Sequence, residues 1–220
     1  MIQKFGRNLF AALIAVFGFS LLANAQANQL TAQTVDVAAA QAAVVKADFS
    51  NIKIGNFGQM DERFYRGAQP VQSDYQSLKD LGVNTVIDLR NDPTDYEKSA
   101  VEALGMKYIN IPMSGWKSPK QADVDAFLTL VNNPDTGKFY VHCKAGIHRT
   151  GVVGAAYRYT NYGWDYDKVY KEMKDYNYSN GLVHGKLGSF VKKWGARLAD
   201  EKSRQAAVQA PTPATHGIQQ

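Results

Sequence analysis

The sequence predicts an α/β domain built around a central mixed, largely parallel sheet that is flanked by helices. Short apolar runs alternate along the chain with segments of helical periodicity, and no internal repeat interrupts residues 48–198. Strands that alternate with helices form sheets that are at least partly parallel and carry helices on their faces. A length of 220 residues suits one domain with tails better than two domains.

The first half of this domain reads as three strands separated by two helices. The run NTVIDLR is rich in β-branched residues and suits a buried strand. The first helix has Ser73 as its expected N-cap, and Gly82 lies just past its end. The predicted strands here are 63–68, 84–90 and 107–113, and the predicted helices are 73–82 and 95–105.

The second half contains one strand and four helices. Within 121–133, helical spacing places Val124, Phe127, Leu128 and Val131 on one face. The run KFYVHC is the candidate for the central strand, and small residues let the helix that follows it pack closely. The predicted strand is 138–143, and the remaining predicted helices are 151–163, 165–176 and 187–199.

The first 25 residues resemble a secretory signal. Lys4 and Arg7 precede an apolar run, and Ala23-Asn24-Ala25 forms a small-x-small cleavage site, with Ala27 as an alternative cleavage point. The apolar run is about a dozen residues long, shorter than the ~20 that a spanning helix needs, which disfavours an uncleaved anchor. We therefore expect export to the bacterial periplasm, with no integral membrane segment after cleavage.

The segments on either side of the domain differ from it in composition. Residues 26–47 are rich in Ala and Gln and are predicted to form a linker, and residues 199–220 are predicted to be a disordered tail. Losing the signal changes the net charge from +5 to +3, a mildly basic balance that is consistent with an anionic substrate. No Lys/Arg-rich run indicates nucleic-acid binding, and we expect a monomer.

Cys143 is the single cysteine of the chain, so it has no internal disulfide partner. A lone thiol is a liability in an oxidising compartment, and its retention therefore points to a function. It lies between the predicted central strand and a helix, where open α/β sheets bind their ligands. The alternative is a buried structural thiol, but that interpretation does not explain the adjacent Lys144, His148 and Arg149.

The loop HCKAGIHRTG, residues 142–151, has the features of an anion site. A strand-loop-helix turn of this length can surround one dianion with backbone N–H groups, and the helix N-terminus adds its dipole. Arg149 offers a two-pronged donor for phosphate oxygens. The same positive potential favours the thiolate of Cys143, and a thiolate beneath a phosphoryl group is an in-line nucleophile.

This motif, H-C-x5-R-T-G, resembles the signature loop of the cysteine-dependent protein tyrosine and dual-specificity phosphatases. Other segments are similar to small bacterial members of that superfamily, so the resemblance covers most of residues 57–176. These segments are RFYRGAQP, LGVNTVIDLR, YINIPMSGW and YRYTNYGWDYDKVYKEM. The loop itself matches at His142, Cys143, Gly146, Arg149, Thr150 and Gly151.

The resemblance implies a single phosphatase domain over 48–198 and a role for each loop residue. Cys143 would be the nucleophile, Arg149 would clamp the phosphate, the Thr150 hydroxyl would stabilise the sulfur anion, and His142 would orient the loop. The cradle would consist of the backbone amides of Lys144, Ala145, Gly146, Ile147, His148 and Arg149. Two rival functions remain: a rhodanese-like sulfurtransferase, and an inactive phosphate-binding pseudophosphatase.

The expected general acid is missing from the sequence. These phosphatases usually place an aspartate on a mobile loop before the cysteine, but Ser114-Gly115-Trp116 stands there in this chain. Three explanations stay open: Asp123 reaches in from the next helix, His148 serves as the acid, or the substrate has a good leaving group. Asp123 could instead be an ordinary helix N-terminal charge.

The loop composition bears on the substrate, which we expect to be a phosphorylated protein or a small phosphate or phosphoinositide. Lys144 and His148 add positive charge at the rim, as in phosphatases of phosphoinositides or inositol polyphosphates, whereas Trp116 could be an aromatic wall. The four histidines have no ligand-like spacing, so the sequence implies no metal and no organic cofactor.

Overall fold

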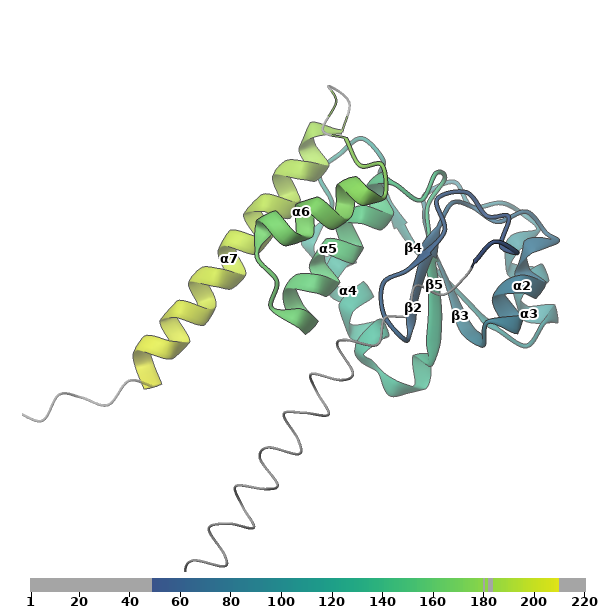
Figure 1. Ribbon diagram of the computed structural model, residues 1–220, viewed down its shortest axis with the longest axis horizontal. Helices are drawn as coiled ribbons and strands as arrows, with labels where there is room; N and C mark the ends of the chain where they lie inside the picture. The colour runs from purple at the N-terminus through teal and green to yellow at the C-terminus, as the bar shows by residue number, and fades with distance from the viewer. Residues whose placement is uncertain (1–48, 180, 182–183, 210–220) are drawn as a thin grey trace, which may run out of the picture. The chain divides into compact units, whose positions relative to one another are not determined.

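The computed structural model describes residues 49–179, 181 and 184–209. In this part of the chain, five strands form one sheet in the order β1-β2-β5-β3-β4 (Figure 1). The strands are β1 (Gly58–Gln59), β2 (Phe64–Gly67), β3 (Val83–Arg90), β4 (Lys107–Met113) and β5 (Lys138–His142). The four predicted strands are therefore confirmed, and β1 was not predicted.

Strand β5 lies at the centre of the sheet. It runs parallel to β2 on one side and to β3 on the other, β3 runs parallel to β4, and only β1 is antiparallel to its neighbour. The prediction of a mixed, largely parallel sheet is confirmed. Because the strands are parallel, the ends of β2, β3 and β5 meet at one edge, where His142 is the register partner of both Gly67 and Asp88.

Helices cover both faces of the sheet (Figure 1). The smaller hydrophobic cluster lies against α2 and α3, and the larger one lies against the remaining four helices. Along β5 the side chains alternate between these clusters, with Phe139 and Val141 in the larger one and Tyr140 in the smaller one, as the pleat of a strand requires. The helices are α2 (Asp74–Asp80), α3 (Glu97–Ala103), α4 (Gln121–Asn132), α5 (His148–Tyr162), α6 (Tyr166–Asp175) and α7 (Gly185–Gln209), with a short 3₁₀ turn, η1 (Pro134–Thr136).

The predicted packing faces of two helices agree with the structure. In α4, Val124, Phe127 and Val131 are fully buried and Leu128 is partly buried. Helix α5 is buried along most of its length, and its small residues allow close contact, since a Cβ at Gly154 would come within 3.2 Å of the Met60 side chain. The helix that follows the candidate loop is thus the central helix of the larger cluster.

The predicted tail differs from the structure. Helix α7 continues through Gln209, so residues 199–209 are helical rather than disordered. The reason is local: this stretch consists mostly of good helix formers, and it carries i,i+4 ion pairs between Arg197 and Glu201 and between Asp200 and Arg204. Such contacts can hold a helix that has no apolar periodicity, and the absence of that periodicity was the reason for predicting a disordered tail.

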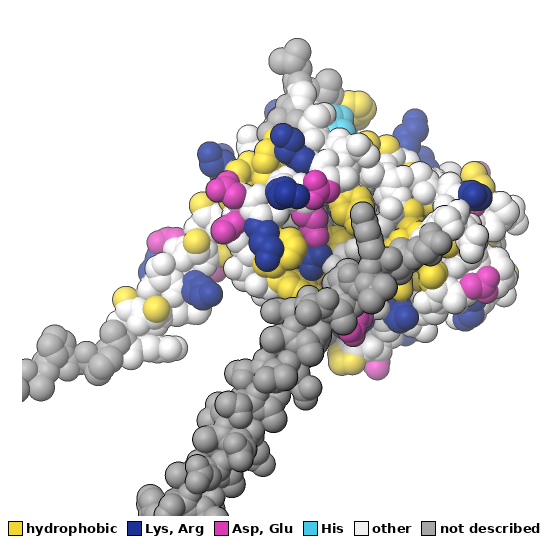
Figure 2. Space-filling model, viewed as in Figure 1, with side chains coloured by type: hydrophobic (Ala, Val, Ile, Leu, Met, Phe, Trp, Pro, Cys, Tyr) yellow, Lys and Arg dark blue, Asp and Glu magenta, His cyan; other side chains and the backbone are white. Residues whose placement is uncertain are grey.

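The predicted signal, the whole predicted linker and the last eleven residues of the tail lie within 1–48 and 210–220, outside the described residues. Among the helices that are described, none has the length and apolar character needed to cross a bilayer. Figure 2 shows Lys/Arg and Asp/Glu side chains interspersed over α6. That pattern is typical of a solvated surface and does not form the basic stripe of a nucleic-acid-binding face.

Candidate active site

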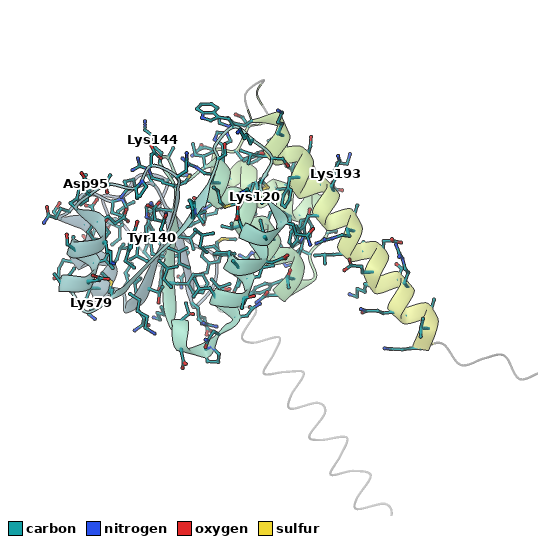
Figure 3. All side chains as sticks on the ribbon, turned by 180° about the vertical axis from the view of Figure 1, so that it is seen from behind. Lys79, Asp95, Lys120, Tyr140, Lys144 and Lys193 are labelled. Atoms are coloured by element: carbon teal, nitrogen blue, oxygen red, sulfur yellow. The ribbon has the colours of Figure 1, made fainter. Side chains whose placement is uncertain are left out.

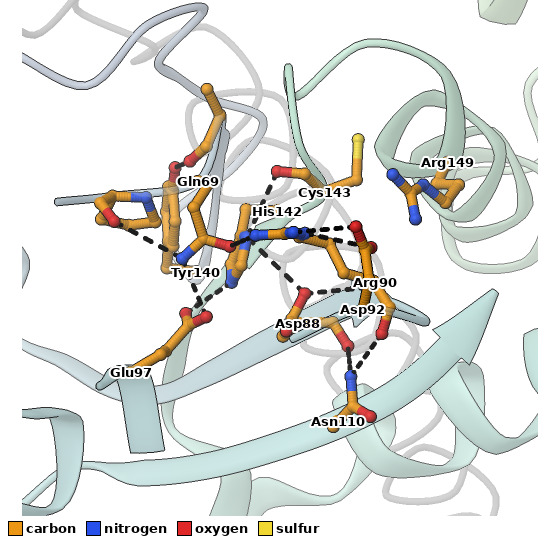
Figure 4. A network of polar contacts seen from close by, with 12 residues as sticks. Gln69, Asp88, Arg90, Asp92, Glu97, Asn110, Tyr140, His142, Cys143 and Arg149 are labelled. Atoms are coloured by element: carbon orange, nitrogen blue, oxygen red, sulfur yellow. Dashed lines mark hydrogen bonds and ion pairs between the residues drawn. The ribbon is translucent and has the colours of Figure 1, made fainter. Parts of the chain in front are cut away.

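The candidate loop leaves the carboxyl end of the central strand, where the ligand site of such a sheet is expected. Residues 143–147 connect β5 to α5, and α5 begins at His148. Cys143 is 3% exposed at the start of this loop, and Arg149 lies in the first turn of the helix (Figure 4). The expected strand-loop-helix arrangement is confirmed.

The loop backbone has its carbonyl groups bonded to the surrounding protein. The Lys144 carbonyl accepts from the Gln69 amide at 3.2 Å, and the Ile147 carbonyl accepts from the Gly151 amide at 2.9 Å. The Gly146 carbonyl accepts from Asn56 Nδ2 at 2.9 Å and from Arg66 Nη2 at 2.7 Å. The loop is therefore held from outside through the carbonyls of Lys144 and Gly146, whereas the Ile147 bond belongs to the start of α5.

The loop amides, by contrast, lack oxygen acceptors. Within the described part of the chain, the N–H groups of residues 144–149 donate to no oxygen atom. Successive N–H groups without acceptors in a loop of this kind offer the donors that an anion needs. The dipole of the 15-residue helix α5 favours negative charge at the same place. This is the geometry of a phosphate cradle.

Gly146 can only be glycine in this loop. Its φ angle is +69°, and a Cβ added there would lie 2.2 Å from the backbone carbon of Gly67 on β2. The left-handed conformation turns the Gly146 carbonyl toward Arg66 and Asn56, and the missing side chain lets the loop lie directly against β2. The glycine in the motif is therefore explained by local geometry.

The surroundings of Cys143 favour its thiolate. Burial by itself raises the pKa of the thiol, but four stabilising interactions outweigh it and lower the pKa below its ordinary value: hydrogen bonds from the Thr150 hydroxyl and amide, the charge of Arg149, and the Gly146 amide. The Thr150 hydroxyl is buried and forms no regular hydrogen bond with another described residue, so its hydrogen is available to the thiolate.

The Arg149 guanidinium is held only loosely by the protein. Its Nη1 donates to Asn91 Oδ1 and to the Met113 carbonyl, both at 3.3 Å, and the side chain is half-buried. Most of its five donors are therefore available to a bound oxyanion. Gly115 lies against it, because a Cβ at Gly115 would be 3.9 Å from both the Cζ and Nε of Arg149.

The other predicted substrate-binding residues lie around the loop at different depths. Lys144 and Ala145 are exposed, and Figure 3 shows Lys144 at the edge of the molecule, far from the buried Tyr140. Ile147 and His148 are half-buried. These residues make up the loop, and the exposed Lys144 side chain lies beside it; their binding of substrate stays a prediction.

Behind Cys143 lies a buried network of charged groups that the sequence did not predict (Figure 4). His142 is fully buried, and its Nε2 lies 2.7 Å from Glu97 Oε1 while its Nδ1 lies 3.8 Å from Asp88 Oδ1. Burial raises the pKa of Glu97, but the hydrogen bond and charge of His142 outweigh this and lower it. Burial is the main cause that raises the pKa of Asp88.

The same three residues form a donor set that could hold a metal ion, although the histidine spacing had implied none. Each carboxylate nevertheless has other partners. Glu97 accepts from Gln69 Nε2 at 2.8 Å, and Asp88 accepts from the Arg90 amide at 2.8 Å and from the Tyr108 hydroxyl at 3.0 Å. We interpret the cluster as an ion-pair network that supports the start of the loop.

The two candidates outside the loop differ in their surroundings. Asp123 lies in the first turn of α4, where the helix dipole favours a carboxylate, and its side chain makes no hydrogen bond or ion pair with any described residue. Trp116 is 65% exposed and stacks on His184, with ring centroids 5.4 Å apart. The structure thus adds no contact that links Asp123 to the loop.

Two further residues, Arg66 and His184, contact the loop, and no specific sequence signal assigned them a role. Arg66 is buried and bonded to the Gly146 carbonyl, and its guanidinium lies 4.0 Å from the ring centre of Tyr176. His184 packs against His148, with ring centroids 3.5 Å apart. The contacting pairs are separated by 80 and 36 positions, so no local pattern could have linked them.

Comparisons with known proteins agree on one superfamily. A family model described as "DSP-PTPase phosphatase fused to NAD+ Kinase" matches residues 35–192. The probable tyrosine-protein phosphatase DG1060 of Dictyostelium discoideum is 27% identical over 124 residues, which are 54% of this chain and 74% of that protein. Across the curated relatives, the matched segment spans between 10% and 78% of the relative's length.

Solved structures show the same fold. The structure of P. aeruginosa TpbA in complex with pTyr has a TM-score of 0.58 and 23% identity, covering 74% of this chain and 95% of that one. The core catalytic domain of the PP-IP phosphatase SIW14 from S. cerevisiae, in complex with citrate, has a TM-score of 0.57 and 22% identity, covering 70% of this chain and 93% of that one. At these identities the likeness establishes the fold.

Proposed function

The chain belongs to the dual-specificity phosphatase family of cysteine-dependent enzymes, and on that premise we propose that it hydrolyses phosphomonoesters through a cysteinyl-phosphate intermediate. This proposal rests on two features that occur together at residues 143–149: backbone N–H groups without an oxygen acceptor, and a thiol whose pKa is lowered. A binding protein would need the amides but not the thiolate, so the combination favours catalysis.

The proposed reaction has two steps. The Cys143 thiolate attacks phosphorus, the S–P bond forms, and the P–O bond to the leaving group breaks. The loop amides and Arg149 surround the phosphoryl oxygens, where negative charge shifts during transfer, and such preorganised donors supply much of the rate enhancement. Water then attacks phosphorus, and its attack releases phosphate and returns the thiolate. Thr150 stabilises the sulfur whenever it is the leaving group.

We propose aryl phosphates of the phosphotyrosine type as the substrate class. Trp116 is exposed at the rim, next to the loop segment that lies against Arg149, and it offers a flat apolar surface to an aromatic leaving group. A phenolate also leaves more readily than an alkoxide, which suits a loop without a carboxylate at residues 114–116. The TpbA structure with pTyr supports the same class.

Inositol or lipid phosphates are a second candidate, favoured by a different observation. A hollow lies between the segment after Trp116 and the start of α7, and Lys186 and Lys193 line it together with Ser118 and Ser189. These two lysines would attract a ligand that carries more than one phosphate. SIW14, whose fold this chain shares, is a PP-IP phosphatase.

The location of the enzyme is part of the proposal. The basic start, the short apolar run and the Ala-Asn-Ala site of residues 1–25 support export to the periplasm of a bacterium. There, the enzyme would act on phosphorylated proteins or small phosphates outside the cytoplasm. Cleavage after Ala25 or Ala27 would be read directly from the N-terminal sequence of the protein recovered from that compartment.

Turnover of a chromogenic aryl phosphate tests the proposed function. We expect Cys143→Ser to reduce turnover to the rate without enzyme, and Arg149→Lys to cost about 10²–10³-fold because it removes a planar donor for the phosphoryl oxygens. Arg197→Lys, on the surface of α7, is the matched control and should keep wild-type activity. Turnover of thiosulfate in place of the aryl phosphate would indicate a sulfurtransferase. Wild-type protein that binds phosphate but turns over neither substrate would indicate a pseudophosphatase.

A further inference from the structure

A histidine lies where this phosphatase lacks its acidic residue. Nδ1 of His184 is 3.1 Å from the carbonyl oxygen of Gly115, in the middle of Ser114-Gly115-Trp116. Because a carbonyl oxygen only accepts, Nδ1 must carry the hydrogen of this contact. The second nitrogen, Nε2, is then the one whose proton is available for transfer.

The His184 ring is positioned by aromatic contacts from two other segments. It stacks on Trp116, with a centroid distance of 5.4 Å and an interplanar angle of 15°, and on His148, at 3.5 Å and 23°. His148 also packs against Tyr178, with centroids 5.3 Å apart. A solvated rim histidine would have no such set of contacts, so the imidazole is held in one orientation.

This imidazole lies close to the phosphate clamp. Gly115, which accepts its hydrogen bond, packs against the Arg149 guanidinium, and His148, on which it stacks, directly precedes Arg149 in the loop. Arg149 holds the phosphoryl oxygens in the proposed reaction, and the leaving group must depart on the side of the open rim. Since Trp116, on which His184 also stacks, is exposed at that rim, we expect the leaving oxygen to pass near His184.

Two imidazoles at this distance are expected to share a single proton, since two stacked cations repel each other. Burial, the charge of His184 and the charge of Arg149 lower the pKa of His148, and a hydrogen bond to the Ser179 backbone opposes them. The charged or titratable groups that act on the pair from neighbouring elements are Arg149 on α5 and Tyr178 after α6. His148 is therefore the ring of the pair that its surroundings keep neutral.

We propose that His184 donates the proton to the leaving oxygen, with His148 and Trp116 as positioning residues, in place of the missing loop aspartate. The inference rests on the proposed cysteinyl-phosphate reaction. As the S–P bond forms and the P–O bond breaks, the leaving oxygen takes the Nε2 proton. Neutral His184 then takes a proton from the water that attacks phosphorus, and the imidazolium and the thiolate are both restored.

The test compares substrates whose leaving groups need different amounts of help from an acid. His184→Asn should reduce turnover of an alkyl phosphate by about 10²–10⁴-fold, the usual contribution of a positioned acid, and that of a dinitrophenyl phosphate by less than about threefold. The alkaline limb of the pH–rate profile for the alkyl phosphate should disappear as well. His184→Gln is the second variant, in case the first is poorly folded by circular dichroism.

Two controls separate this inference from the proposed function. Asp123→Asn should leave both substrates at wild-type rates, and Cys143→Ser should abolish turnover of both. If the His184 variants lose the same factor on both substrates, or if Asp123→Asn shows the dependence on leaving group instead, His184 is not the proton donor and the inference is overturned. In either of those cases the dinitrophenyl activity and its dependence on Cys143 would still support the cysteinyl-phosphate reaction.

Discussion

The guanidinium of Arg66 donates a hydrogen bond of 2.7 Å to the carbonyl oxygen of Gly146, from a side chain that is 1% exposed. Arg66 belongs to β2 and Gly146 to the loop after β5, so this contact joins the loop to the neighbouring strand of the sheet. It holds the Gly146 carbonyl away from the cradle. The orientation of the loop amides therefore depends on a residue outside the motif.

Gly146→Ala should disrupt the cradle. The new methyl group would overlap the Gly67 backbone, and the positive φ angle adds strain, so we expect activity on an aryl phosphate to fall more than about 100-fold, as a misplaced reactive group can cost. Gly163→Ala is the matched control, because Gly163 also has a positive φ of 62° but has nothing within 4 Å. That variant should lose about 1 kcal/mol of unfolding free energy and keep its activity. Equal activity of the two variants would contradict the explanation of Gly146.

Thr150→Ala should raise the pKa of the Cys143 thiol, because it removes the hydroxyl that stabilises the thiolate. The pH dependence of alkylation by iodoacetamide should shift to higher pH, and kcat at neutral pH should fall roughly 10–100-fold, the value of a hydrogen bond to a charged group. Thr150→Ser keeps a hydroxyl and should therefore keep the wild-type alkylation profile and kcat. Thr160→Ala, at an exposed position of the same helix, should change neither quantity. If the alkylation profile of Thr150→Ala is not shifted, the Thr150 hydroxyl does not stabilise the thiolate.

Glu97→Gln should destabilise the domain in a pH-dependent way. The pKa of Glu97 is lowered in the folded state, so the unfolded state binds more protons; this stabilisation is present above the ordinary pKa near 4.5 and is lost as the pH falls through the lowered value. At pH 7 we expect urea unfolding to show a loss of about 3–5 kcal/mol, because the substitution leaves His142 with a broken buried ion pair.

The difference between wild type and Glu97→Gln should shrink below pH 4.5. Burial and, in smaller part, the charge of Glu97 raise the pKa of Asp88, so the substitution also relieves part of that rise. Glu102→Gln, exposed on the same helix, is the matched control and should change stability by less than about 0.5 kcal/mol at every pH. A loss in Glu97→Gln that stays constant with pH would mean that the ion pair with His142 is not its cause.

The sequence predicted those parts of the fold that depend on local patterns. Strand β4 begins and ends where the apolar run does, and the buried face of α4 follows from its spacing. The position of the loop also followed, because the order of strand, loop and helix is readable in one stretch. The range predicted for helix α7 ended at residue 199, ten residues too early, because its last turns are held by exposed ion pairs rather than by an apolar face.

The supports of the loop could not be predicted, because they join segments that are far apart in the sequence. Glu97 reads as an ordinary charge in an exposed helix, yet the fold buries it against His142, 45 positions later. His184 carries no motif, and only its contacts with Gly115 and His148 distinguish it. Residue type and spacing predict the reacting group, whereas its supporting contacts depend on the tertiary structure.

The most direct test of the central claim is to trap the phosphorylated enzyme. Wild-type protein mixed with an excess of aryl phosphate, quenched in acid within one turnover and digested, should yield one peptide that is heavier by a phosphoryl group on Cys143. The same peptide from Cys143→Ser protein should carry no added mass. Phosphate on another residue, or full turnover by the Cys143→Ser variant, would contradict the account.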